Sequence, residues 1–247
     1  DPYMDDKLAA FPYVNGGLFA DENIEIPRIT AEIVELLVTE CSEGFDWTDI
    51  SPTIFGAIFE STLNPETRRS DGMHYTSIEN IHKVIDPLFL DDLQTEFQTI
   101  QDIKVKRTRN DRLRAFQQKL ASLRFLDPAC GSGNFLTETY LSLRRIENEV
   151  ISLLNDGSMV LDLDNPIHVS ISQFYGIEIN DFAVTVAKTA LWIAESQMME
   201  ETESIVRMQL DFLPLTTNAF IHEGNALRMD WKEILPPSDD VKIFGNP

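Results

Sequence analysis

One stretch of the chain holds residue types that suit a nucleotide-binding turn, and it reads Leu126-Asp127-Pro128-Ala129-Cys130-Gly131-Ser132-Gly133-Asn134-Phe135-Leu136. A hydrophobic run predicts a buried strand that ends at Asp127, and the segment after Gly133 predicts a long amphipathic helix. Glycines permit a positive φ and let a ligand approach the backbone closely. A helix start also offers unpaired N–H groups. The stretch therefore predicts a nucleotide-binding corner between a strand and a helix.

The position of the acid indicates which kind of nucleotide would bind at this corner. The spacing differs from the dinucleotide fingerprint G-x-G-x-x-G, and no Lys-Ser/Thr pair follows to make a phosphate loop. Asp127 precedes the glycines, where its carboxylate would repel a phosphate. A carboxylate there suits a ligand that carries a positive amine or sulfonium, or sugar hydroxyls.

Three further predicted strands each end in a polar residue. The second ends at Glu178, where an acid can accept hydrogen bonds from ribose hydroxyls. The third leads into a turn that contains Asn225, and the fourth covers residues 241–244 and runs into Asn246. Strands that alternate with helices predict an α/β fold with a doubly wound parallel sheet, preceded by a helical region.

The nine residues D-P-A-C-G-S-G-N-F resemble motif I of the S-adenosyl-L-methionine-dependent DNA amino-methyltransferases. This resemblance implies a class I methyltransferase fold in which Glu178 holds the cofactor ribose and Asn225 pairs with its adenine. Asn225 departs from the Asp that is usual there, but an amide can also pair with adenine. The cofactor-binding positions implied by the resemblance are Thr76, Asp127, Pro128, Ala129, Gly131, Gly133, Glu178, Ile179, Asn225 and Ala226.

A segment upstream of motif I, Gly72-Met73-His74-Tyr75-Thr76-Ser77, is similar to motif X of the same family. There the family grips the methionine carboxylate of the cofactor, so the resemblance implies this role for Thr76. Ser77 stands where the family usually has Pro. Taken alone, the segment is explained by a plain N-cap, because Thr76 or Ser77 could cap the helix that follows. Its place before motif I favours the family interpretation, since that order defines the γ-type arrangement.

The last residues resemble the beginning of the catalytic motif Asn/Asp-Pro-Pro-Tyr/Phe. The resemblance implies that the Asn246 side chain and the Pro247 carbonyl accept hydrogen bonds from the exocyclic amine of a flipped base, and Asn-Pro favours adenine. The second Pro and the aromatic residue are absent. We therefore expect a truncated fragment, cut inside its catalytic motif and inactive by itself, and the first residue, Asp1, likewise suggests an internal or processed start.

The charge balance is unusual for a nucleic-acid binder. The chain has 41 acids against 20 bases, a net charge of −21, whereas phosphate contacts require positive surface. Either the DNA-contacting surface lies in another part of the protein, or the substrate is not DNA. Eight cations nevertheless cluster in one short stretch, and both a solvated helix face and a contact to the DNA backbone explain them: Lys104, Lys106, Arg107, Arg109, Arg112, Arg114, Lys119 and Arg124.

Two domains are predicted: a helical spacer over residues 1–66 and a methyltransferase domain over residues 67–247. The loop at residues 11–19 resembles a segment in the helical spacer of the fused, single-chain restriction-modification enzymes of the MmeI type, although an ordinary Gly-Gly turn explains it equally well. This second resemblance implies double-stranded DNA as partner, a C-terminal target-recognition domain and, before residue 1, a nuclease. A helix beginning at Ser51-Pro52 is also predicted.

Several classes of protein are disfavoured by composition. No run has the length of a membrane span, and no secretory signal is present, so a cytoplasmic protein without a membrane partner is expected. The two cysteines form no disulfide framework. The four histidines show no metal-ligand spacing, so no metal is expected.

The sequence therefore predicts a site-specific DNA adenine N6-methyltransferase of a restriction-modification system. Two alternatives stay open. A protein glutamine-amide methyltransferase also uses Asn-Pro-Pro-Tyr and would suit the acidic surface, whereas His74-Tyr75-Thr76 before motif I favours DNA. A binding or assembly module that has lost catalysis is the third candidate.

Overall fold

The computed structural model describes residues 28–44, 50–54, 56, 76–155, 166–207, 210 and 218–246. The predicted spacer loop at residues 11–19 lies outside the described residues. So do His74 and Tyr75 of the motif X segment and the predicted catalytic residue Pro247.

A four-stranded parallel sheet forms the centre of the fold, in the order β3-β2-β1-β4. Its register pairs Phe125 with Phe174 and Leu126 with Ile243. The strand order reverses beside β1, which is the switch point where open parallel sheets bind ligands. The predicted doubly wound parallel sheet is thereby confirmed, with strands at β1 (Arg124–Asp127), β2 (Phe174–Glu178), β3 (Phe220–Glu223) and β4 (Val241–Ile243).

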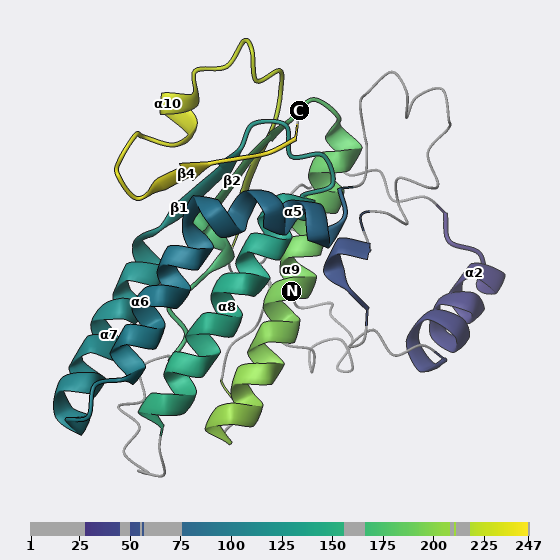
Figure 1. The fold of residues 1–247 in the computed structure, drawn as a ribbon. Coiled ribbons are helices and arrows are strands. Elements are labelled where there is room, and N and C mark those ends of the chain that lie inside the picture. The colour runs from purple at the N-terminus through teal and green to yellow at the C-terminus, as the bar shows by residue number, and fades with distance from the viewer. Residues whose placement is uncertain are drawn as a thin grey trace, which may run out of the picture.

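Among the described residues, the long helices pack on one face of the sheet, and the short helix α10 with its flanking residues packs on the other. Figure 1 shows α6, α7, α8 and α9 grouped together, with α10 on its own beside the strands. None of the described helices is both long and apolar enough to span a bilayer. The helices of this body are α5 (Ile78–Ile85), η4 (Asp86–Leu90), α6 (Asp91–Gln101), α7 (Lys106–Ser122), α8 (Asn134–Leu154), η5 (Ile171–Gln173), α9 (Asp181–Val206) and α10 (Trp231–Ile234).

Alternate strand residues supply two cores. Phe125 and Phe174 stack with their ring centroids 5.1 Å apart and belong to the large core that includes side chains of α5 to α9. Leu126 and Ile177 belong to a smaller core with Leu235, just after α10. Because side chains cover both faces of β1 and β2, the sequences of these central strands are largely hydrophobic without a polar alternation.

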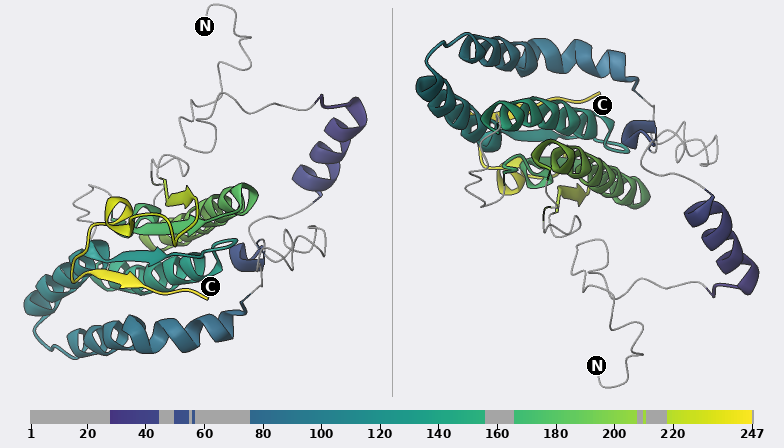
Figure 2. Two further views of the ribbon diagram at one scale, coloured as in Figure 1. Left: turned by 90° about the horizontal axis from the view of Figure 1, so that it is seen from above. Right: turned by 90° about the horizontal axis from the view of Figure 1, so that it is seen from below.

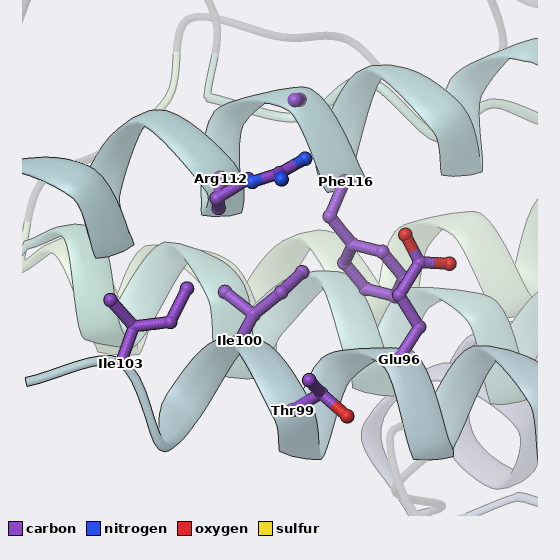
Figure 3. A pocket seen from close by; sticks show the side chains of 7 residues that line it. Glu96, Thr99, Ile100, Ile103, Arg112 and Phe116 are labelled. Carbon is purple, nitrogen blue, oxygen red and sulfur yellow. The ribbon is translucent and has the colours of Figure 1, made fainter.

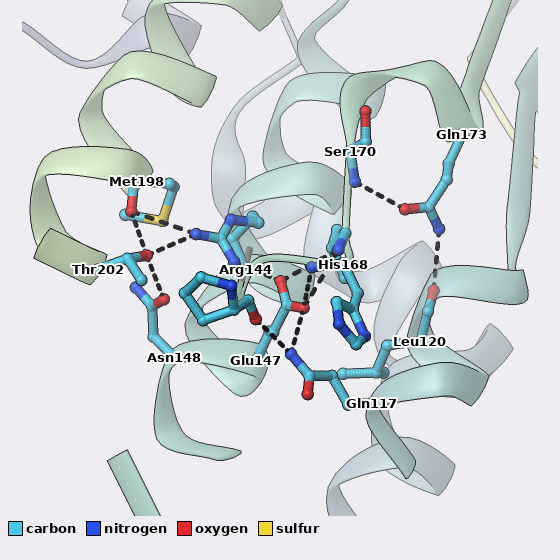
Figure 4. Close-up of polar contacts among 12 residues, drawn as sticks. Gln117, Leu120, Arg144, Glu147, Asn148, His168, Ser170, Gln173, Met198 and Thr202 are labelled. Atoms are coloured by element: carbon cyan, nitrogen blue, oxygen red, sulfur yellow. Dashed lines mark hydrogen bonds and ion pairs between the residues drawn. The ribbon is translucent and has the colours of Figure 1, made fainter. Parts of the chain in front are cut away.

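A buried ion pair fixes the helices below the sheet. Arg144 and Glu147, both on α8 and both fully buried, form a salt bridge. Arg144 Nη2 donates to Thr202 Oγ1 of α9 at 2.6 Å, and Gln117 Nε2 of α7 donates to Glu147 Oε1 at 2.8 Å. Glu147 Oε1 also accepts the backbone N–H of His168 at 2.7 Å, as Figure 4 shows. One charge pair therefore ties α7, α8, α9 and the segment that enters β2.

Within the predicted helical spacer, the structure describes α2 (Ala31–Leu36) and the π-helix η2 (Leu37–Glu43). The Thr30 side chain caps it by accepting the N–H of Ile33 at 3.4 Å. Its apolar side chains are exposed, Leu36 most of all at 58%. Figure 2 draws this purple segment apart from the α/β body.

Candidate functional site

The predicted turn after β1 is present, and its glycines have the backbone that requires glycine. Asp127 ends the strand with its side chain buried, and its Oδ1 accepts the N–H of Ala129 at 3.0 Å. Gly131 has φ +53° and Gly133 has φ +81°, both in the left-handed region. A Cβ at Gly133 would lie 2.9 Å from the Cβ of Ala187 on α9. This turn (residues 128–133, here the glycine turn) therefore packs directly against a helix.

Glu178 ties the end of β2 to the glycine turn. Its Oε2 accepts the N–H of Gly131 at 2.9 Å and its Oε1 accepts the N–H of Asn180 at 3.0 Å. The carbonyl of Ile177 accepts the N–H of Cys130 at 3.1 Å, which adds a second link. A carboxylate has about four lone-pair sites, so Glu178 keeps acceptor capacity for a ligand beside its two backbone bonds.

Two acids meet at this corner, and their surroundings shift the pKa of one of them. Burial, helped by the nearby charge of Glu178, raises the pKa of Asp127 to about 7, although the hydrogen bond from Ala129 acts in the opposite direction. Burial also raises the pKa of the Cys130 thiol well above its ordinary value, so Cys130 is protonated at neutral pH. A ligand that brings positive charge would relieve the repulsion between the two carboxylates.

The ends of β2 and β3 present apolar side chains next to polar turns. Ile179 is 59% exposed and Leu227 is 93% exposed. Gly224 donates its N–H to the carbonyl of Glu178 at 2.8 Å, which joins the two strand ends. Asn225 Oδ1 accepts the N–H of Leu227 at 2.9 Å, and the carbonyl of Ala226 accepts Nε1–H of Trp231 at 2.8 Å. This edge combines exposed apolar surface with fixed amides.

The segment that follows β4 lies directly beside Asp127 at the end of β1, because the two strands are parallel neighbours. Phe244 donates its N–H to the carbonyl of Leu126 at 3.1 Å. Gly245 follows with φ +149°, and a Cβ there would lie 2.4 Å from Asp127 Oδ1. Asn246 is the next residue along. The structure thus brings the predicted catalytic segment and the glycine turn together.

Thr76 lies at the start of α5, one residue before the N-cap Ser77. Ser77 occupies the N-cap position, as one of the two expected candidates, but its hydroxyl makes no hydrogen bond to the first turn of α5. α5 reaches α8 through His82, whose Nε2 lies 3.3 Å from Glu138 Oε1. Desolvation opposes the charged ring, but the bonds to Asp86 and Glu138 prevail and raise the pKa of His82.

A family model for the MmeI DNA-methyltransferase domain matches residues 102–247, more than half of the chain. The chain belongs to this family. It is 43% identical over 243 residues to DNA methyltransferase A of Bacillus subtilis strain 168, a match that covers 97% of this chain and 26% of that protein. The chain therefore spans about a quarter of that relative's length.

A solved structure of the type IIL restriction-modification enzyme MmeI in complex with DNA has the same fold as this MmeI-family chain, with a TM-score of 0.82 and 41% identity. That match covers 94% of this chain and 30% of the other. The resemblance drawn from the motifs is confirmed at the level of family and fold, and both matches extend well upstream of motif I.

Six of the eight cations of the basic cluster in this MmeI-family chain lie on α7, away from the glycine turn, whereas Arg124 begins β1. Gln117 of α7 is hydrogen-bonded to Glu147 of α8. Glu147 lies thirteen residues after Asn134, the first residue of α8, which is about 20 Å along the helix at 1.5 Å per residue. A groove of about 350 Å³ between α6 and α7 is on the same remote part, and Figure 3 shows Ile100, Phe116 and Arg112 in its walls. Neither feature borders Asn246.

Proposed function

We propose that this chain forms the cofactor-binding part of a site-specific DNA adenine N6-methyltransferase of a restriction-modification system, with S-adenosyl-L-methionine as methyl donor. Family membership supports the reaction class. The observation that supports the proposal is the close approach of Gly245 to Asp127, because Asn246 follows Gly245 and the glycine turn follows Asp127. A methyl donor held at that turn and an amine held at Asn246 would be neighbours.

The residues at the strand ends fit this cofactor. Nothing lies within 4 Å of the position that a Cβ would take at Gly131, so a ligand can approach the backbone there. Asp127 and Glu178 supply negative charge for a sulfonium and an amine, and exposed Ile179 supplies apolar surface for the adenine. Bound S-adenosyl-L-methionine supplies an electrophilic methyl group.

Each predicted residue has a role in this proposal. Glu178 accepts hydrogen bonds from the ribose, while Asn225, Ile179 and Ala226 hold the adenine. Asp127 and the glycine turn, including Pro128 and Ala129, hold the methionine end, and Thr76 contacts its carboxylate.

Asn246 and the Pro247 carbonyl accept hydrogen bonds from the exocyclic amine of the flipped adenine. These two acceptors would draw the amine protons toward the protein and raise the electron density on the amine nitrogen. Bound S-adenosyl-L-methionine would supply the methyl group to that nitrogen and leave as S-adenosyl-L-homocysteine, while one amine proton would pass to solvent. Catalysis consists of positioning and hydrogen-bond polarisation, without a covalent enzyme intermediate.

Double-stranded DNA is the proposed partner, and the likeness to MmeI, whose structure was solved in complex with DNA, supports this assignment. A target-recognition domain and a nuclease are proposed in the full-length protein beyond these residues.

Calorimetry with S-adenosyl-L-methionine tests the cofactor assignment on wild type and Glu178→Ala. We expect binding to wild type and at least tenfold weaker binding to Glu178→Ala, because the variant loses the ribose acceptor and the bond to Gly131. Glu200→Ala, an exposed acid near the far end of α9, is the matched control and should bind as wild type does. Equal affinity in Glu178→Ala would contradict the ribose assignment, and absence of binding by wild type would contradict the proposed function.

A further inference from the structure

A short turn far upstream of motif I lies against the glycine turn. Residues 52–54 and 56 are helical, and Gly56 is buried. A Cβ at Gly56 would lie 2.6 Å from Ser132 Oγ and 2.9 Å from Ser132 Cβ. It would also lie 3.0 Å from Asn134 Oδ1, at the first residue of α8. The backbone of Gly56 therefore rests on the residue between the two left-handed glycines.

A second contact fixes the other end of this turn. Gln197 Nε2 of α9 donates to the carbonyl of Ile50 at 2.7 Å. Between the two anchors, Thr53 is only 1% exposed, and its hydroxyl lies 2.7 Å from that of Ser51. The described residues 50–54 and 56, here the upstream turn, are thus held to α9 at one end and to the glycine turn at the other.

The glycine turn depends on its neighbours for its shape. The space beside Gly131 is open, and the space beside Gly133 is filled by Ala187. Ser132, between them, is 6% exposed and is backed by Gly56. Because left-handed glycines lose much conformational freedom when they are ordered, a wall at Ser132 stabilises the conformation that a cofactor would meet.

We propose that the upstream turn (residues 50–54 and 56) belongs to the cofactor site as a positioning element, with Gly56 holding Ser132 and Gln197 holding the turn. This inference rests on the proposed function only in taking S-adenosyl-L-methionine as the ligand of the glycine turn. It assigns part of the predicted spacer, residues 1–66, to the cofactor site.

The test is calorimetry of S-adenosyl-L-methionine with the full-length protein and a double-mutant cycle at the contact. Gly56→Ala should weaken binding at least tenfold, because the added Cβ displaces the stem of Ser132 and the turn backbone with it. Ser132→Gly removes Oγ and Cβ, the two Ser132 atoms that the new Cβ would meet. The double variant Gly56→Ala with Ser132→Gly should therefore lose less affinity than the two single losses multiplied together. Gln197→Ala should weaken binding about threefold, because the upstream turn loses its anchor on α9. Gln118→Ala, exposed on α7, should leave binding unchanged.

Two further readouts separate positioning from general stability. Thermal unfolding without cofactor should change little in Gln197→Ala, and cofactor should slow amide hydrogen exchange of the upstream turn in wild type. Wild-type affinity in Gly56→Ala, or additive effects in the cycle, would overturn the inference. If wild type itself binds no S-adenosyl-L-methionine, the proposed function fails instead, which the same titration shows first.

Discussion

Asp127 is a buried carboxylate whose charge depends on pH in the neutral range, since burial raises its pKa to about 7. A cationic cofactor needs the ionised form. Below pH 7 the cofactor must first displace a proton from Asp127, so affinity for S-adenosyl-L-methionine should fall by about tenfold per pH unit for a one-proton linkage. Above pH 7 the group is already ionised and affinity should level off.

Calorimetry from pH 5.5 to 8.5 measures this dependence, and buffers of different ionisation enthalpy count the protons released. Asp127→Asn keeps the side-chain size and the acceptor for Ala129, so it should bind more weakly at pH 8 and show a flat profile. A wild-type affinity that does not change between pH 5.5 and 7 would contradict the contact between Asp127 and the cationic end of the cofactor.

Gly245 allows a second test at the scale of one residue. Alanine there would place its Cβ 2.4 Å from Asp127 Oδ1 at a φ of +149° that alanine rarely adopts. We expect the turnover number for DNA methylation by the full-length protein to fall about 100-fold, because Asn246 shifts relative to the base, while cofactor affinity changes only a few-fold.

Tritium transfer to duplex DNA measures turnover for Gly245→Ala, and calorimetry measures cofactor affinity in parallel. Ser238→Ala, in the exposed loop before β4, is the control and should behave as wild type. Unchanged turnover in Gly245→Ala would show that the segment over Asp127 does not position the base.

At the scale of elements, the sequence predicts what local patterns determine. The strand that ends at Asp127 and the strand that ends at Glu178 are found where the hydrophobic runs place them. The long helix expected after Gly133 spans Asn134–Leu154, and the side chain of Asn180, just after the second strand, caps α9. Periodicity and capping are local signals, so they are readable without the fold.

Contacts between distant segments are not readable in this way. Gly56 on Ser132 and Gly245 on Asp127 join residues 76 and 118 positions apart, and no local pattern distinguishes these glycines from turn glycines. Arg144 sits among charged residues that suggest a solvated face, yet it is fully buried. Conversely, the apolar residues of α2 have helical spacing but are exposed.

The buried pair Arg144–Glu147 yields the prediction at this scale. Arg144→Met or Glu147→Gln should each lower the free energy of unfolding by about 3–5 kcal/mol, because each leaves a buried partner uncompensated. The double variant Arg144→Met with Glu147→Gln should lose less than the sum of the two single effects, because neither charge is then left without its partner and the glutamine at position 147 keeps an acceptor for the N–H of His168. Urea denaturation measures all three.

Lys83→Ala is the control for the buried pair, because it removes an ion pair on the surface. The Lys83 side chain is 65% exposed and that of its partner Glu79 is 84% exposed. Its effect should stay below about 1 kcal/mol. A loss of that same size for Arg144→Met would mean that the network does not hold α7, α8 and α9 together.

At the scale of the whole molecule, the distribution of charge bears on where the proposed DNA partner would bind. Eight of the 20 basic residues fall within residues 102–124, which hold only two acidic residues. The rest of the chain has 12 basic and 39 acidic residues. The bond between Gln117 and Glu147 places the basic helix α7 about 20 Å along α8 from the glycine turn. This position favours the solvated-face interpretation over a contact to the DNA that enters the site.

Replacing Arg107, Arg112 and Arg114 by Gln tests that choice in the full-length protein. We expect the dissociation constant for duplex DNA to stay within about twofold of wild type, with an unchanged salt dependence, because α7 contacts no phosphate. Each lost phosphate contact would instead reduce the slope of log affinity against log salt by about 0.9. Fluorescence anisotropy between about 50 and 200 mM KCl spans the range in which such a change is large. A slope reduced by two or more would make α7 a DNA-binding surface, and the duplex would then extend along the helices as well as across the strand ends.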